Sequence, residues 1–425
     1  MPRAAPRGGG AAMSLAALPR IPRRRATVVP CYAGRAWPLL RLMLGGLSLV
    51  VLTLGIWRFW LRARLRRHYW SAIRIAGQPL EFTGTGAEMF LGFLIAVIVL
   101  AVVLGLANLV LGFLGMAYLP ALGGFNLSIL GAVPLMYLAS YRARRYLMAR
   151  TRWRGIRFGM TPGAAGYTVR GLGYLFLAAA TLGLLVPLMD FRLRKFALDR
   201  TWFGDLRFTQ EGSWLGFLRP WLWAWLPLAA AGLAVAGLAE WEAPGWPALA
   251  PVAVIGALAG GLGLVNYRVA ARRYAICHTR LGQGVRFASA LRTRRVIGIA
   301  CAGALLVALI MLLVLALVSG ALWAIAAMLG AGDVLSAPLR PDGAGLPGDA
   351  RGLALAGAGV ALYLIATIAG FALAEVLIFQ PLVQYHVETL TISGAGELDD
   401  ALQRPPDAMP EAGGLADVLD VGAGI

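Results

Sequence analysis

Four clusters of arginine recur along the chain, and each is followed by an aromatic residue, a glycine and a short tripeptide that ends in Phe. Arginines at i and i+4, such as Arg268 and Arg272, share one face of a helix. Guanidinium groups beside aromatic rings at a bilayer surface attract anionic lipid headgroups. The ordinary alternative is positive flanking of membrane helices by arginines that snorkel. We expect the headgroup contacts at Arg62, Arg66, Tyr69, Arg142, Arg145, Tyr146, Arg192, Arg194, Phe196, Arg268, Arg272 and Tyr274.

The tripeptides share one pattern, an aliphatic residue, a charged residue and Phe. They are Leu80-Glu81-Phe82, Ile156-Arg157-Phe158, Leu206-Arg207-Phe208 and Val285-Arg286-Phe287, preceded by Gly77, Gly155, Gly204 and Gly282. We expect each glycine to let the chain turn. The aromatic residue before it is then expected at headgroup level, and the Phe after it at the membrane interface.

Polar side chains inside the apolar runs are rare, and such groups in a membrane usually serve a function. Glu375 is the clearest case, and Asn108 and Asn266 complete a possible intramembrane polar site. Glu375 either binds a cation or relays a proton, or it lies near the cytoplasmic end of its helix and pairs with an arginine. We favour the arginine pair.

Catalytic motifs are missing from the sequence. It has no phosphate-binding loop with its lysine, no paired histidines for zinc and no Gly-x-Ser-x-Gly elbow. The three histidines and three cysteines are scattered without metal-ligand spacing. We therefore predict no catalytic residue, no metal site and no cofactor, and we expect a protein that is not an enzyme.

Composition defines the class of protein that must position these residues. Apolar residues make up 59% of the 425, charged residues only 14%, and the mean hydropathy is +0.73. Soluble chains are nearer half apolar and a quarter charged, so these values indicate an integral membrane protein. The net charge of +19 resides in clusters beside apolar runs, and no base-reading motif is present. The expected partners are membrane lipids and not nucleic acid, and protein partners stay open.

Three pairs of apolar runs are long enough for two helices of about 20 residues each. They lie within 89–141, 214–267 and 296–380. The runs are continuous rather than alternating, which excludes the strands of a membrane barrel. Gly256 and Gly260 have the spacing that favours close helix packing. The predicted fold class is an all-α polytopic membrane protein with six to eight transmembrane helices in a tandem internal repeat.

Two further apolar segments, 42–57 and 171–189, are short. As helices they reach about 24 and 28 Å, against a bilayer core of about 30 Å. If both span, the second repeat is inverted and one pair of arginine clusters must cross the membrane. If they are interfacial or re-entrant, every cluster stays cytoplasmic, as the positive-inside rule requires. We favour six firm spans with two short segments that are interfacial or re-entrant, and keep the eight-span topology as the alternative.

Residues recur at an offset of 127 to 129 positions. Thr53-Leu54-Gly55 matches Thr181-Leu182-Gly183, and Arg145-Tyr146 matches Arg273-Tyr274. The chain is thereby divided into a disordered basic N-terminal tail (1–36), a first membrane repeat (37–163), a second membrane repeat (164–290), a partial third repeat formed by a helix pair (291–394) and a disordered acidic C-terminal tail (395–425).

Thr53-Leu54-Gly55-Ile56, Phe82-Thr83-Gly84-Thr85-Gly86, Arg194-Lys195-Phe196 and Phe203-Gly204-Asp205 are the most distinctive stretches. With the other motifs, over residues 40 to 393, they resemble the YjgN-like family of bacterial inner-membrane proteins, domain-of-unknown-function family 898. One departure is that an expected Asn before Thr is replaced by Arg150, Arg200 and His278. The resemblance implies a polytopic inner-membrane protein and brings no established activity.

The expected function follows from the charge pattern and the resemblance together. We expect a non-catalytic, multi-pass protein of the bacterial inner (plasma) membrane, whose cytoplasmic Arg-aromatic motifs contact anionic lipid headgroups. Its C-terminal tail is expected in the cytoplasm. The alternative is a transporter or channel for a small solute or lipid, built on the internal repeat.

Overall fold

A curled antiparallel sheet organises the fold. The computed structural model describes residues 27–118, 128–238, 246–328 and 350–403. Across the sheet the eleven strands lie in the order β1 (Thr27–Val28), β11 (Leu390–Ser393), β10 (Val285–Ser289), β9 (Thr279–Leu281), β8 (Leu206–Gln210), β7 (Thr201–Phe203), β6 (Ile156–Met160), β5 (Thr151–Trp153), β4 (Gln78–Phe82), β3 (Ile73–Ile75) and β2 (Cys31–Tyr32). The predicted all-α class is therefore wrong. The strands are two to five residues long, too short to give an alternating hydrophobic signal.

The two edges of the sheet lie close together. β1 pairs with β11 at one edge, whereas β2 pairs with β3 at the other. Only Val29 and Pro30 separate β1 from β2 in the sequence, and a chain that short reaches at most about 11 Å. The sheet must therefore curl until its edges almost meet. These strands also replace part of the tail that we expected at 1–36, while residues 1–26 lie outside the described residues.

The repeated glycines close β-hairpins. Ala76 and Gly77 have φ of 49° and 79°, and Arg154 and Gly155 have φ of 53° and 77°. Two successive residues with positive φ form the two-residue turn whose twist matches that of paired strands. The glycines turn the chain as expected. The Phe of each tripeptide lies in the second strand of its hairpin rather than at a membrane interface. Phe158, Phe208 and Phe287 stack on one another across the sheet.

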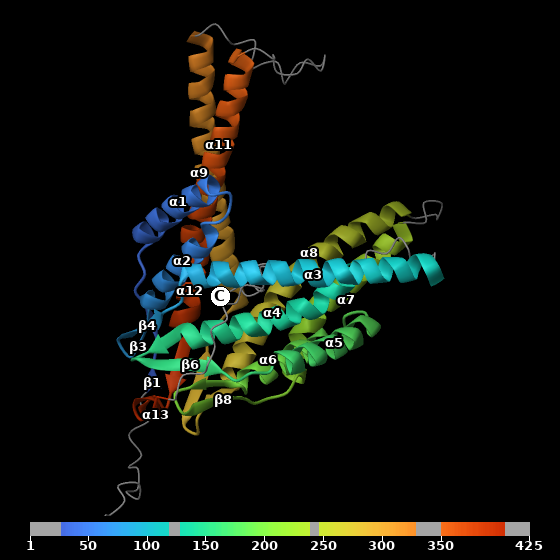
Figure 1. The fold of residues 1–425 in the computed structure, drawn as a ribbon, viewed down its shortest axis with the longest axis vertical. Helices are drawn as coiled ribbons and strands as arrows, with labels where there is room; N and C mark the ends of the chain where they lie inside the picture. Colours follow the sequence, from blue (N-terminus) through green and yellow to red (C-terminus); the bar gives the residue numbers. More distant parts are fainter. Residues whose placement is uncertain (1–26, 119–127, 239–245, 329–349, 404–425) are drawn as a thin grey trace, which may run out of the picture.

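Helices connect the hairpins and extend from the sheet (Figure 1). They are α1 (Ala36–Leu52), α2 (Arg58–Ala72), α3 (Gly86–Tyr118), α4 (Ser128–Arg150), α5 (Ala164–Ala180), α6 (Val186–Leu198), α7 (Leu215–Leu238), α8 (Trp246–Cys277), α9 (Thr293–Met328), α11 (Ala350–Ala374), the π-helix η4 (Glu375–Phe379), α12 (Gln380–Glu388) and α13 (Gly396–Asp399). A helix directly precedes each hairpin, with α2 before β3, α4 before β5, α6 before β7 and α8 before β9. α12 precedes β11 in the same way.

Five of these helices are long and apolar enough to cross a membrane. They are Gly86–Val110, Leu215–Gly237, Leu249–Cys277, Thr293–Ala321 and Gly357–Glu388. Five of the six expected spans thus correspond to helices of membrane length and apolar composition among the described residues. The second run of the first pair falls on α4, whose C-terminal half carries the arginines of a basic motif. Parts of the expected connections at 118, 240–245 and 333–351 lie outside the described residues.

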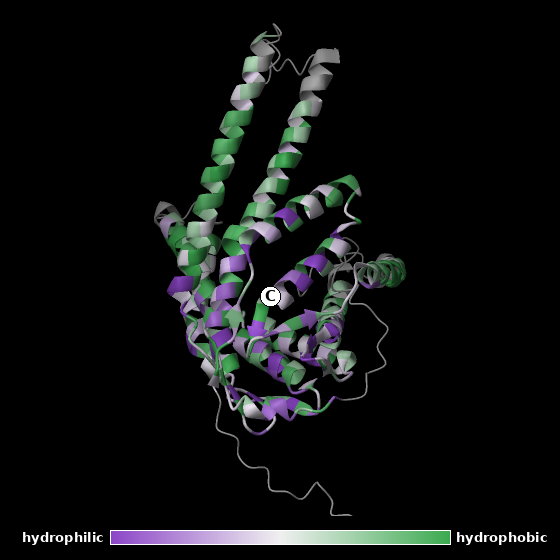
Figure 2. Cartoon of the chain, turned by 90° about the vertical axis from the view of Figure 1, so that its left-hand side faces the viewer, coloured by the Kyte–Doolittle hydropathy of each residue, from purple (hydrophilic) through white to green (hydrophobic). Residues whose placement is uncertain are grey.

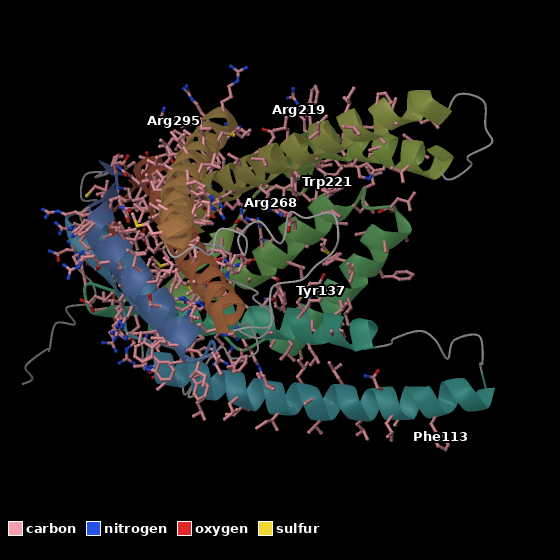
Figure 3. The ribbon with its side chains drawn as sticks, turned by 90° about the horizontal axis from the view of Figure 1, so that it is seen from above. Phe113, Tyr137, Arg219, Trp221, Arg268 and Arg295 are labelled. Atoms are coloured by element: carbon pink, nitrogen blue, oxygen red, sulfur yellow. The ribbon has the colours of Figure 1, made fainter. Side chains whose placement is uncertain are left out.

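Many apolar side chains on these helices are exposed rather than packed against the other described residues. Phe113 of α3 is 79% exposed and projects away from the rest of the molecule (Figure 3). Figure 2 shows hydrophobic residues along the helices and hydrophilic residues gathered toward the sheet. Exposed apolar surface of this extent is unfavourable in water and favourable in lipid.

The two short segments fold back on themselves. α1 and α2 pack together, as do α5 and α6, and each pair is joined by a Thr-Leu-Gly turn. Leu54 and Gly55 have φ of 51° and 92°, and Leu182 and Gly183 have φ of 49° and 85°. The Thr53 hydroxyl donates to the Leu49 carbonyl oxygen and accepts from the Trp57 N–H. α1 with α2 and α5 with α6 thus form helical hairpins, of which the two short segments supply the apolar arm and the turn. Their re-entrant or interfacial placement stays a prediction. The tandem repeat of whole units stays a prediction.

Small residues set the spacing of α7 and α8, as Gly256 and Gly260 predicted. A Cβ added at Gly256 would lie 2.7 Å from the Pro227 carbonyl oxygen. At Gly263 it would lie 2.6 Å from the Ala224 Cα, so the two backbones are nearly in contact.

Gly263→Leu is expected to destabilise the protein by about 1–3 kcal/mol, because the side chain must push α7 and α8 apart. Thermal unfolding in detergent measures the effect. Gly261→Leu is the matched control, since no atom lies within 4 Å of a Cβ added there. Equal melting temperatures for the two variants would contradict the packing.

Candidate functional site

One arginine occupies the same position on each of four helices. Arg66, Arg144, Arg194 and Arg272 precede the first strand of their hairpin by seven residues, since the strands begin at 73, 151, 201 and 279. Because the hairpins are neighbours in one sheet, this position recurs around its curl. Arg194 lies within electrostatic range of both Arg144 and Arg272, and Arg272 lies within range of His386 on α12.

The surroundings of Arg144 disfavour its charged form, although its side chain is exposed. Its side chain is exposed to solvent, yet the surrounding protein lowers the pKa of its guanidinium group. The nearby positive charge of Arg194 lowers this pKa further, whereas Tyr167 opposes the shift. Arg144, Arg194 and Arg272 are called the interior arginines below.

Three tyrosines hold carboxylates from other helices. Tyr69 donates to Glu375 Oε1 (2.6 Å), Tyr146 to Glu88 Oε2 (3.0 Å), and Tyr267 to Asp190 Oδ2 (2.8 Å). Arg150 also pairs with Glu88, at 3.0 Å. Burial and the contact with Glu375 raise the pKa of Tyr69 well above its usual value, so the phenol keeps its proton and remains a donor. These bonds fasten α2 to η4, α4 to α3 and α8 to α6.

The expected polar site draws its residues from three helices, with Glu375 on η4, Asn108 on α3 and Asn266 on α8. The hydrogen-bond partner of Glu375 is Tyr69 rather than the arginine that we expected. Asn266 accepts a hydrogen bond from the Thr293 hydroxyl (2.9 Å). Glu375 opens a π-helical turn, a feature that is frequent at functional sites.

The expected headgroup residues separate into two groups. Arg142, Arg192 and Arg268 are exposed on α4, α6 and α8. By contrast, Tyr69 and Tyr146 are 2% and 4% exposed and pack among apolar side chains. These two tyrosines therefore lie in the protein core rather than at headgroup level. The other seven residues are partly buried on α2, α4, α6 and α8. They are Arg62, Arg66, Arg145, Arg194, Phe196, Arg272 and Tyr274.

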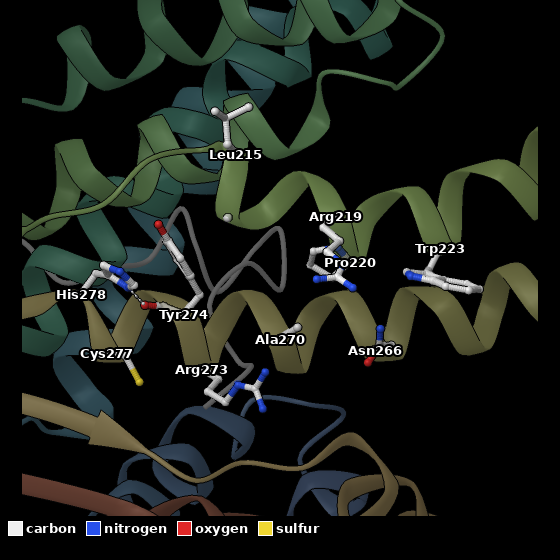
Figure 4. A pocket seen from close by; sticks show the side chains of 11 residues that line it. Leu215, Arg219, Pro220, Trp223, Asn266, Ala270, Arg273, Tyr274, Cys277 and His278 are labelled. Carbon is white, nitrogen blue, oxygen red and sulfur yellow. Dashed lines mark hydrogen bonds between the residues drawn. The ribbon is translucent and has the colours of Figure 1, made fainter.

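A groove of about 590 Å³ runs between α7 and α8 (Figure 4). His278 lies at one end and Trp223 at the other, with Arg219 and Arg273 between them. Leu215 supplies further apolar surface, and Trp223 is 70% exposed. The groove therefore combines cationic groups with an apolar, aromatic wall beside two membrane-length helices.

Two further hollows are also basic. One of about 500 Å³ is lined in part by Arg64, Arg67 and His68, and one of about 310 Å³ is lined in part by Arg200 and Arg207. Within the described ranges no three His, Cys, Asp or Glu side chains come together as a metal site would require.

Sequence reasoning missed Arg144 and Arg219 as site residues. The signal for Arg144 was available, because it has the same spacing before Thr151 as Arg272 has before Thr279. Arg219 lies outside the four motifs, and only the packing of α7 on α8 brings it near Arg273. No feature of the sequence points to that contact.

The fold and the hollows define a class of protein: membrane-length apolar helices built on a curled sheet, with arginine-rich surfaces near the sheet. The chain belongs to a family described as "Bacterial protein of unknown function (DUF898)", whose sequence model matches residues 31–417. The match confirms the resemblance found in the motifs. No curated protein and no solved structure matches the chain.

Proposed function

We propose that this protein is a non-catalytic protein of the bacterial inner membrane that binds anionic phospholipids, with the groove between α7 and α8 as a headgroup site. The observation that carries the proposal is the meeting of Arg219, Arg273 and Trp223 in one hollow. An anionic phosphodiester pairs with guanidinium groups, and basic residues near an anionic bilayer contribute about 1 kcal/mol each. Trp favours the membrane interface, where one part of its ring is apolar and another polar.

The arginines of the groove have no carboxylate partner among the described residues. Among the residues that the structure describes, no carboxylate forms an ion pair with Arg219 or Arg273. Arg273 donates to the Leu291 carbonyl oxygen at 3.4 Å, and His278 is held by the Tyr274 carbonyl oxygen at 2.9 Å. The hollow thus keeps cationic donors available to a ligand from the membrane.

Binding is tested with delipidated protein in detergent, titrated with brominated phosphatidylglycerol or brominated phosphatidylcholine while tryptophan fluorescence is recorded. Wild-type fluorescence is expected to be quenched by the anionic lipid at concentrations at least tenfold lower. Arg219→Gln/Arg273→Gln is expected to remove most of this preference. Trp223→Phe is expected to remove part of the quenching without changing the midpoint.

Arg286→Gln is the matched control, because Arg286 is exposed on β10, away from the groove. A double variant with wild-type lipid preference would overturn the groove as the site. Equal affinity of the wild-type protein for the two lipids would overturn the proposed function itself.

The orientation of the protein follows from its charge. The basic motifs belong to one sheet, and the positive-inside rule favours the cytoplasm for that side. We propose that the sheet and the C-terminal tail are cytoplasmic.

Transport is the second candidate function. The Tyr69–Glu375 pair favours it, because Glu375 is an ionisable group in the apolar helix Gly357–Glu388. Glu375→Gln tested in proteoliposome flux assays decides between a role in transport and a structural contact.

A further inference from the structure

We propose that the interior arginines, Arg144, Arg194 and Arg272, form a second site that binds a phosphate-class anion, separate from the groove between α7 and α8. The three guanidinium groups come from α4, α6 and α8, and Arg194 is within electrostatic range of the other two. The site extends the proposed lipid binding, because its ligand is either a free anion or a phospholipid headgroup.

The cluster keeps an excess of positive charge among the described residues. No described carboxylate forms an ion pair with any of the three arginines. One carboxylate lies nearby: Asp190 stands one helical turn before Arg194, acts on Tyr167 together with Arg144 and Arg194, and accepts a hydrogen bond from the Tyr267 hydroxyl. Three guanidinium groups thus share a single carboxylate. Arg194 contacts the face of the Phe217 ring, at 5.8 Å. His386 of α12 lies within electrostatic range of Arg272 and supplies no negative charge.

Three guanidinium groups that share one carboxylate keep a net positive charge, and the repulsion among them opposes folding. Such an arrangement is favourable when a ligand supplies the opposite charge. Arginine donates in a planar fork that matches the oxygens of a phosphate group. The hydroxyl of Tyr167, which lies near Arg144 and Arg194, is a further donor for such an anion.

The recurrence of the position supports a site rather than a chance contact. Each interior arginine precedes the first strand of its hairpin by seven residues. The three hairpins are neighbours in one sheet, so the sheet brings equivalent positions of the three helices close together.

The test compares wild-type protein, Arg194→Gln and Arg286→Gln in lipid-free detergent. Arg286 is an exposed arginine on β10 and serves as the matched control. Melting temperatures are measured at constant ionic strength in chloride, in inorganic phosphate and in pyrophosphate. Phosphate stabilises proteins in general. The informative quantity is therefore the difference between variants. We expect pyrophosphate to raise the melting temperature of wild type and Arg286→Gln, with an apparent affinity at least tenfold above that of Arg194→Gln.

A second readout separates a binding role from a structural one. In chloride alone, Arg194→Gln is expected to be at least as stable as wild type, because the substitution removes repulsion. An arginine that held the fold together would instead lower the melting temperature when replaced.

A lipid arm identifies the source of the anion. The same three proteins are placed in nanodiscs of phosphatidylglycerol or phosphatidylcholine. Arg194-dependent stabilisation by phosphatidylglycerol alone supports a headgroup ligand, and Arg194-dependent stabilisation by pyrophosphate supports a free anion. Absence of any Arg194-dependent difference in both arms overturns the site. The groove is tested separately through Arg219 and Arg273, so the failure of one proposal is distinguishable from failure of the other.

Discussion

Cysteines placed at Gln78 and Thr209 will react with a membrane-impermeant maleimide from the same side of the membrane. Gln78 begins β4, Thr209 lies in β8, and both positions are exposed. The strands between them form a continuous hydrogen-bonded series, β4-β5-β6-β7-β8. An open sheet cannot cross the bilayer core, because lipid-exposed strand ends leave backbone groups unsatisfied. The sheet therefore assigns the first and second halves of the chain to one compartment.

The labelling uses intact cells or sealed vesicles and a background in which the native cysteines are replaced. Cys31, Cys277 and Cys301 are all exposed, so each would otherwise react. Met328→Cys is the internal reference. It ends α9, a helix of 36 residues, which at 1.5 Å per residue is about 54 Å long and exceeds the bilayer thickness. We expect label at Met328 from the side opposite to Gln78 and Thr209, with at least a tenfold difference in extent.

Opposite-sided labelling of Gln78 and Thr209 is the result that the eight-span alternative requires, since it inverts the second repeat. That outcome would also contradict the sheet, because β4 and β8 could not then belong to it. The experiment thus tests fold and topology with the same pair of positions.

The long apolar helices were predictable from composition, because uninterrupted apolar runs of membrane length are visible in the sequence itself. The turn at Gly155 was also predictable, since positive φ demands a residue of that kind. The sheet was not predicted. Leu206-Arg207-Phe208 does alternate between partly buried and exposed side chains, but three residues of alternation are ordinary in any amphipathic segment.

The candidate site depends on contacts that no local pattern contains. Arg144 and Arg272 are 128 residues apart, and only the order of hairpins in the sheet brings their helices together around Arg194. For Tyr69 the local pattern was present but led to a wrong placement. An aromatic residue beside arginines is typical of a membrane interface, yet Tyr69 faces inward because Glu375 of η4 accepts its hydroxyl proton in a hydrogen bond.

Deletion of residues 395–425 is expected to destabilise the protein by about 3–5 kcal/mol, because the first part of this segment completes the core of the sheet. We expected the whole segment to be disordered, but residues 395–403 instead pack against the sheet, while 404–425 lie outside the described residues. Leu398 is 7% exposed and contacts the cluster that contains Trp153 and Phe203.

The acidic side chains of this segment bind the hairpin turns. Glu397 accepts hydrogen bonds from the N–H groups of Gln283 and Gly284, at 3.2 and 2.6 Å. Asp399 pairs with Arg154 in the turn between β5 and β6. Asp205, in the turn between β7 and β8, accepts from the Leu402 N–H at 2.9 Å. Three successive hairpins are therefore held by one short stretch of chain.

Thermal unfolding in detergent, followed by circular dichroism, measures the loss. Deletion of 404–425 is the matched control, since it leaves every one of these contacts in place, and its melting temperature is expected to stay near that of the full chain. Leu398→Ala isolates the apolar part and is expected to cost about 2–4 kcal/mol. Glu397→Ala isolates the charged hydrogen bonds, each worth about 1.5–3 kcal/mol. Equal melting temperatures for the two deletions would show that the segment does not complete the sheet. Additive effects of Leu398→Ala and Glu397→Ala would indicate two independent contributions, whereas a smaller combined effect would mean that losing either contact already releases α13.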